Sequence, residues 1–168
     1  MPEITTPRDL FLHELGDILY VERKLAEETL PKLIEEVQDE EFARELEKHL
    51  DETRGHVTNV EQVFELLGEA PHEEECIGFE GLKKEHDKLV GQASSDLIDL
   101  VDVGAAARTE NYEIAAYESL RRMAKGLGEE EAVTLLDENL KEEKETLRAV
   151  EKAATRLSKE GAAQASGS

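Results

Sequence analysis

Ionisable side chains interrupt four apolar helical stripes, each near the middle of its stripe. In four long segments the apolar residues recur every three or four positions, which is typical of helices with one face toward a core. The residues that break these stripes are Glu22; His49, Glu52 and His56; Glu110 and Glu113; and Glu142 and Glu143. A carboxylate buried without a partner is costly or takes up a proton. Divalent cations would give each carboxylate a positive partner, so the pattern predicts a buried metal site.

The residue types narrow the choice of metal. Ligands that are mostly oxygen, with one or two imidazoles, suit iron or manganese, whereas structural zinc prefers more Cys or His. The number of carboxylates fits two bridged ions. In bundles with such a centre, two helices give one Glu each and two give Glu-x-x-His. Here Glu22 and Glu110 are the expected single ligands, and Glu113, one turn further on, supplies an extra carboxylate.

The two remaining segments depart from that template. In the second segment Glu52 and His56 are four residues apart and still share one helix face, while His49-x-x-Glu52 is a reversed alternative. In the fourth segment either Glu142 or Glu143 is the expected ligand, and Thr146 stands where Glu-x-x-His would place a histidine after Glu143.

Four helices joined by unequal connections must position these residues. The predicted helices span 7–37, 40–67, 97–127 and 129–158, with Pro31 kinking the first. Tight turns near 38–40 and 126–128 predict two antiparallel hairpins. The connection between the hairpins is long enough to cross the bundle and contains a short helix near 80–90. We therefore expect an all-α, ferritin-like four-helix bundle over residues 1–160, followed by a flexible tail at 161–168.

Composition excludes several classes of protein. The 168 residues contain 41 acidic and 20 basic side chains, giving a net charge of −21. No basic surface is expected that could neutralise nucleic-acid phosphates, and docking on an anionic membrane is disfavoured. No apolar run approaches the roughly 18 residues of a membrane helix. The single cysteine, Cys76, excludes an internal disulfide framework and favours a reduced, cytoplasmic location.

The chain resembles the YciE/YciF-like branch of the ferritin-like superfamily along nearly its whole length. The matching stretches are Asp9-Leu10-Phe11 through Glu22, His49-Leu50-Asp51-Glu52-Thr53, Glu110-Asn111-Tyr112-Glu113-Ile114-Ala115-Ala116-Tyr117 and Glu142-Glu143-Lys144. The resemblance implies a four-helix bundle with a rubrerythrin-like dimetal centre, a homodimer and a role in stress responses. The pair Glu110 and Glu113 looks like the doubled carboxylate of a rubrerythrin helix.

Two functions from different classes fit these expectations. The first is a dimetal oxidoreductase of peroxidase or ferroxidase type, which oxidises ferrous iron or another donor with peroxide or oxygen. The second is a non-enzymatic acidic bundle that binds metal or partners during stress. The absence of a histidine after Glu143 keeps the second function open.

Overall fold

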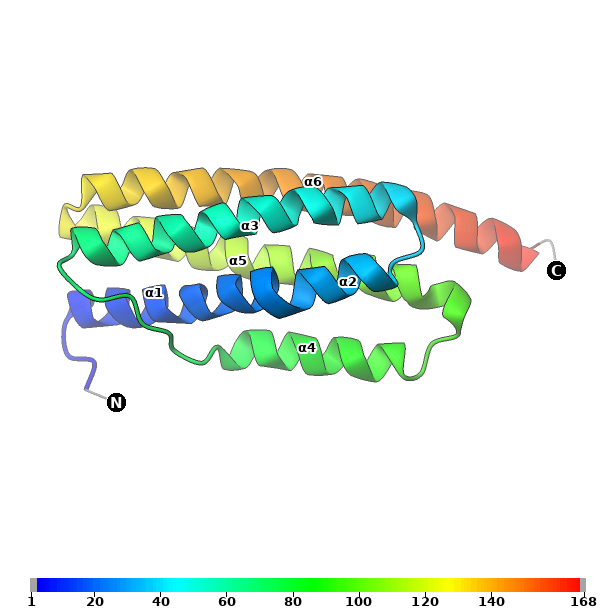
Figure 1. Cartoon of the computed structure of the whole chain (residues 1–168), viewed down its shortest axis with the longest axis horizontal. Coiled ribbons are helices and arrows are strands. Elements are labelled where there is room, and N and C mark those ends of the chain that lie inside the picture. The colour runs from blue at the N-terminus through cyan, green and yellow to red at the C-terminus, as the bar shows by residue number, and fades with distance from the viewer. Residues whose placement is uncertain (1–2, 167–168) are drawn as a thin grey trace.

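Four long helical segments lie side by side and form the molecule (Figure 1). The computed structural model describes the backbone of residues 3–166 and the side chains of residues 3–163. The first segment consists of α1 (Pro7–Lys24), a π-helical turn (Leu25–Thr29) and α2 (Leu30–Glu36). The other three are α3 (Glu40–Leu66), α5 (Ile98–Leu127) and α6 (Glu130–Ser166). Residues 3–166 contain no β-strand, so the predicted all-helical bundle is confirmed.

The connections set the direction of each helix. Asp39 lies at the end of the short turn between α2 and α3. Its side chain accepts a hydrogen bond from Phe42 N and so caps the N-terminus of α3. Gly128, with φ of 82°, makes the turn between α5 and α6, a left-handed conformation that favours glycine. Between these hairpins the chain passes through α4 (Ile77–Val90) and a 3₁₀ turn (Ser95–Leu97). This connection crosses from one end of the bundle to the other, so α3 and α5 run in the same direction (Figure 1).

The first segment is irregular before Pro31, not after it. Thr6 and Asp9 form a capping box and Pro7 occupies the first turn, which starts α1 as the sequence predicts. The helix then widens, and Leu30 N donates to Leu25 O across five residues. Pro31 has no N–H to continue the ordinary ladder, which explains why the wide turn lies just before it. The irregularity that the structure shows is a π turn at Leu25–Thr29, and the kink that Pro31 predicts in the last turns stays a prediction.

The last helix is longer than its periodicity indicates. We predict an end near residue 158, whereas α6 continues to Ser166. Alanines and polar residues beyond Lys159 carry no apolar stripe, yet they are compatible with helix geometry. The flexibility of the tail stays a prediction, and residues 167 and 168 of that tail lie outside the described residues.

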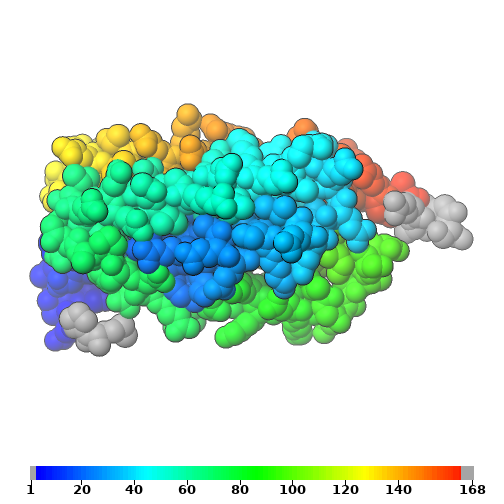
Figure 2. Space-filling view, viewed as in Figure 1, coloured from blue at the N-terminus to red at the C-terminus, as the bar shows by residue number. Residues whose placement is uncertain are grey.

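The core is apolar toward both ends of the bundle. Its largest fully buried apolar side chains are Phe11, Leu15, Ile18, Leu19, Phe42, Phe64, Phe79, Leu120 and Leu136. In the space-filling view the N-terminal segment and α3 lie against each other along the visible face, with α4 along one edge (Figure 2). Burial thus concentrates in one core that the four long segments share.

Among the helices of residues 3–166, none is both long and apolar enough to cross a membrane.

The crossing connection is held close to α1 by a glycine. Glu74 N donates to Gly16 O at 3.0 Å, in the middle of α1. A Cβ at Gly16 would lie 3.0 Å from Glu74 Cγ and 3.3 Å from His72 O. Gly16 therefore permits an approach that a larger residue would obstruct.

We expect Gly16→Ala and Gly55→Ala to change stability in different ways. Both glycines lie inside helices, where alanine normally adds about 0.5–1 kcal/mol. Among the described atoms, none lies within 4 Å of a Cβ at Gly55, so Gly55→Ala should raise the melting temperature. Gly16→Ala should show no such gain, because its methyl group presses on the connection. Equal increases in thermal melts of the two variants would contradict this account of Gly16.

Candidate metal centre

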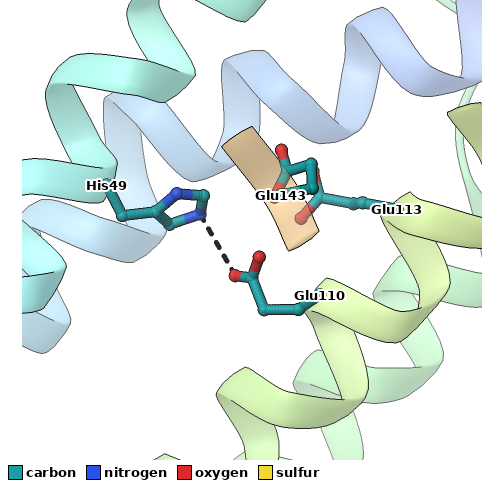
Figure 3. Close-up of side chains that lie close together, drawn as sticks. All are labelled: His49, Glu110, Glu113 and Glu143. Atoms are coloured by element: carbon teal, nitrogen blue, oxygen red, sulfur yellow. Dashed lines mark ion pairs between the residues drawn. The ribbon is translucent and has the colours of Figure 1, made fainter. Parts of the chain in front are cut away.

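Two adjoining groups of histidine and carboxylate side chains lie in the core. The first contains His49, Glu110, Glu113 and Glu143, and the second contains Glu22, His56 and Glu143. In each group one ligand-type atom per residue lies within 4.8 Å of every other. Figure 3 shows the four side chains of the first group pointing into the space between α3, α5 and α6. Glu143 belongs to both groups and therefore joins them.

All four long segments contribute to these groups. Both histidines come from α3, where a separation of seven residues, two turns, places them on one face. Glu110 and Glu113 are neighbours on α5 at a spacing of three residues. The carboxylate of Glu22 comes from α1 and that of Glu143 from α6; both residues have 0% exposure. The apolar residues at the ends of each stripe hold these polar residues at a common level in the core.

Short distances join the members of the two groups. In the first group, His49 Nε2 lies 3.1 Å from Glu110 Oε1. In the second group, His56 Nδ1 lies 2.9 Å from Glu143 Oε1 and 3.4 Å from Glu22 Oε1. Within the described chain, however, neither His49 Nε2 nor His56 Nδ1 forms a hydrogen bond. The nitrogen and oxygen atoms therefore converge without the angles that hydrogen bonds require.

Further polar residues orient the second group. Tyr117 OH donates a hydrogen bond to Glu22 Oε1, and Asn139 Nδ2 donates to Tyr117 OH at 3.0 Å. On its other side, His56 Nε2 lies 2.9 Å from Glu142 Oε2. These contacts fix the imidazole ring and the Glu22 carboxylate. Tyr117 thus hydrogen-bonds a carboxylate of the second group.

Most carboxylate oxygens of the two groups are buried without a partner. Among the carboxylates of the two groups, and considering the described residues alone, the buried oxygens that lack a hydrogen bond are Glu22 Oε2, Glu110 Oε2, and both oxygens of Glu113 and of Glu143. Burial raises the pKa of Glu110 to about 7. Burial and the charge of Glu110 raise the pKa of Glu143 to about 7 as well. The pKa of Glu113 rises well above its ordinary value, through burial and the charges of the neighbouring carboxylates.

For His56, the histidine of the second group, the neighbouring charges affect the pKa more than burial does. Burial disfavours its cationic form, but the carboxylates of Glu22 and Glu143 outweigh that effect. The pKa of His56 therefore rises to about 11. A buried proton on His56 thus compensates part of the charge that the carboxylates would otherwise leave in the core.

This set of donors fits a metal site. Unpartnered buried oxygens are rare in folded proteins, and here they face one another around two imidazoles. Bound cations would give these atoms partners and would allow the carboxylates to ionise. Carboxylate oxygens with imidazole nitrogens are ligands that iron and manganese accept. The buried cluster could therefore hold metal, in agreement with the pattern in the sequence.

Two of the predicted ligands stand outside the groups. Glu52 is about 60° around α3 from His49, and its side chain meets Lys48 Nζ at 2.5 Å and Thr146 Oγ1 at 3.4 Å. Glu142 is about 100° around α6 from Glu143, and its side chain is 43% exposed. The described structure brings neither residue into a group, whereas it does bring in Glu22, His56, Glu110, Glu113 and Glu143.

His49 of α3 takes the place of the histidine that the template expects on α6, where the chain has Thr146. Sequence spacing leaves His49 and His56 as alternatives, but the structure places one histidine in each group. Thr146 Oγ1 lies 3.3 Å from His49 Nδ1, so the residue that replaces the expected histidine on α6 supports a histidine from α3. The seven-residue spacing of the two histidines on one apolar face is the signal that could have indicated this arrangement.

The chain belongs to a known protein family. Residues 6–163 match the family described as "Domain of unknown function (DUF892)", and the chain belongs to that family. It is 33% identical to Protein YciF of Escherichia coli strain K12 over 143 residues, which cover 84% of this chain and 86% of YciF. The YciE/YciF-like resemblance is thereby confirmed.

Solved structures of related proteins have the same fold. The crystal structure of the E. coli stress protein YciF matches with a TM-score of 0.86 and 30% identity, covering 93% of this chain and 99% of that one. YcfI of Rhodopseudomonas palustris, described as "a putative structural protein", matches with a TM-score of 0.85 and 36% identity, covering 89% and 96%. A protein from Xanthomonas campestris, at 20% identity and a TM-score of 0.77, covers 96% and 99% and supports the fold alone.

Proposed function

We propose that this chain is a ferritin-like, dimetal carboxylate protein that acts in stress defence. The observation that carries the proposal is the pair of His/Glu groups that share Glu143 and contain unpartnered buried oxygens. The crossover between two helical hairpins supports a ferritin-like arrangement. The description of the E. coli relative as a stress protein supports the proposed setting. We further propose a homodimer and a cytoplasmic location.

In this proposal the two groups hold two iron or manganese ions. His49, Glu110 and Glu113 would hold one ion, Glu22 and His56 would hold the other, and Glu143 would be shared. Ferrous ions held there would supply the electrons for the reduction of peroxide or oxygen. Tyr117 keeps the Glu22 carboxylate oriented, and the apolar core excludes water from the groups. His56 and Glu142 connect the interior of the centre to the protein surface through Nε2.

Metal analysis and a peroxide pulse test the oxidoreductase function. The full chain is first analysed for metal, then loaded with ferrous iron without oxygen and mixed with hydrogen peroxide. Rapid oxidation, observed as an optical change of protein-bound iron, is the expected result. The control is a Glu143→Gln variant, which keeps nearly the same side-chain shape but loses the shared carboxylate. Equal oxidation rates in the unmodified chain, in the variant and in buffer with free iron would contradict a protein-bound centre.

The second candidate is a non-enzymatic acidic bundle that binds metal or protects other molecules. The net charge of −21 favours this alternative, as does the description of the R. palustris relative as a structural protein. It predicts that bound metal is inert toward peroxide and oxygen or that metal is absent. The same loading experiment distinguishes the two functions.

A further inference from the structure

A cavity of about 300 Å³ leads from the protein surface to the candidate metal centre. Side chains that are at least 50% exposed line its outer end, the mouth: Glu28, Lys32 and Glu36. Side chains that are at most 6% exposed line its inner end: Leu46, Glu110, Thr146 and Val150. Because Glu110 belongs to the first His/Glu group, the cavity ends at that group.

Glu110 is the residue through which the centre meets the cavity. Of the described members of the two groups, Glu110 alone is in the lining. Its Oε2 is fully buried. Its Oε1 has no hydrogen bond within residues 3–163 and is not among the fully buried atoms, in agreement with the 4% exposure of the side chain. A molecule that enters the cavity therefore meets the first group at Glu110 Oε1, whereas the carboxylates of the second group are 0% exposed.

The wall between the mouth and Glu110 is apolar. It includes Leu25, Leu33, Phe79, Leu82, Ala106 and Val150. Three threonines also line the cavity, but none offers it a free hydroxyl group. Thr29 Oγ1 is fully buried, Thr109 Oγ1 donates to Ala105 O at 3.2 Å, and Thr146 Oγ1 lies 3.3 Å from His49 Nδ1. Water needs about two to four polar partners, whereas apolar cavities stay dry and bind gases such as xenon.

The charged groups along the cavity disfavour an ionic occupant. Lys32 Nζ lies 3.8 Å from Glu36, and Lys83 Nζ lies 4.0 Å from Glu28, so both lysines already face carboxylates. The chain as a whole carries a charge of −21, which repels anions. A cation is attracted to the mouth, but it would lose its hydration along the apolar wall at a high cost. The wall therefore favours a small, uncharged and apolar molecule.

We propose that this cavity collects dioxygen from solvent and delivers it to the Glu110 side of the centre. The inference rests on the proposed dimetal function and names its oxidant. Dioxygen is apolar, whereas the two hydroxyl groups of hydrogen peroxide would lack hydrogen-bond partners along the wall. Ala106 lies one turn before Glu110 on α5, so a larger side chain there would stand between the mouth and Glu110.

The paramagnetism of dioxygen allows its collection to be measured without metal. The metal-free full chain is equilibrated with dioxygen or with nitrogen at the same pressure, and the NMR relaxation of its methyl groups is compared. Leu15 and Leu136 are as buried as Leu46 and Val150 but do not line the cavity. We expect dioxygen to enhance relaxation at Leu46 and Val150 at least about threefold more than at Leu15 and Leu136, because packed interiors hold few voids. Equal enhancement at both pairs would overturn the proposal.

A matched pair of variants tests the position of the route. Ala106→Leu fills the cavity, whereas Ala115→Leu adds the same atoms at an exposed position of α5. Circular dichroism verifies that each variant is folded. The enhancement at Leu46 and Val150 should be lost in Ala106→Leu and kept in Ala115→Leu. Full enhancement in a folded Ala106→Leu protein would place dioxygen outside this cavity.

The same variants test delivery to the centre. Each protein is loaded with ferrous iron without oxygen, its iron affinity is measured against a chelator, and it is then mixed with dioxygen. We expect Ala106→Leu to keep the affinity but to slow oxidation by about tenfold, and Ala115→Leu to change neither. Slower iron uptake with an unchanged oxidation rate would assign the cavity to ions and overturn the proposal. Absence of iron binding in all three proteins would contradict the proposed function alone, because collection of dioxygen is measured in the metal-free chain.

Discussion

Replacing Glu143 by Gln is expected to lower the affinity for Mn²⁺ by more than about a hundredfold, because even residues that only support a metal ligand typically contribute 10–100-fold. Glu143 is fully buried and is the carboxylate shared by both His/Glu groups. Gln has nearly the same shape but carries no charge to neutralise an ion. Loss of this one carboxylate should therefore weaken the binding of both proposed ions.

The neighbouring residue provides the control for this experiment. Glu142→Gln makes the same chemical change on the same helix, but the Glu142 side chain is 43% exposed and contacts the outer nitrogen of His56. We expect it to change metal affinity by less than about tenfold, as for a weak supporting contact. Titrations of the metal-free proteins against a competing chelator measure both constants. Equal losses in the two variants would contradict the assignment of Glu143 as the shared ligand.

The metal-free protein is expected to lose stability as the pH rises from about 4.5 to about 7. Burial raises the pKa of Glu110 and of Glu143 from 4.5 to about 7, so the folded chain binds more protons than the unfolded chain in this range. The stability that these protons contribute is complete below pH 4.5 and is lost as the pH passes 7. Bound metal should reverse the trend, because ligation requires ionised carboxylates and stabilises the folded state.

Glu110→Gln separates this effect from other sources of pH dependence. The variant should melt at a higher temperature than the unmodified protein without metal at pH 7, because one buried charge is removed. It should also gain less from added Mn²⁺. Glu151→Gln, at an exposed position on α6, is the matched control and should do neither. If Glu110→Gln lowers the metal-free melting temperature and keeps the full metal increment, Glu110 is an ordinary structural residue.

Local sequence signals were sufficient to predict the four long helical segments and the crossover, but not the end of α6. Thr6 and Pro7 mark the start of α1, and Gly128 marks the turn between α5 and α6, because capping and turn chemistry depend on a few neighbouring residues. The π turn at Leu25–Thr29 could not be predicted in this way. Widening a helix by one residue shifts its register without altering the residue types, and Pro31 indicated a disturbance but not its form.

The helical periodicity predicted the position of the candidate centre along the bundle better than it predicted which residues belong to the centre. It placed Glu22, Glu110, Glu113 and Glu143 at mid-bundle, where the structure has them. It did not exclude Glu52, because a residue about 60° from the core face still belongs to a broad helical stripe. Which side of that stripe meets a neighbouring helix depends on how the helices pack. That same packing brings His49 of α3 to the place opposite Thr146 of α6.

The glycine turn between α5 and α6 has a consequence for the order of folding. These two helices adjoin in sequence and pack against each other, so closing the short loop between them costs little chain entropy. We expect this hairpin to form early, bringing Glu110 and Glu113 near Glu143 before α3 delivers its histidines. Carboxylates would then repel one another in the nascent hairpin. Low pH or divalent ions should therefore accelerate refolding, in addition to stabilising the finished protein.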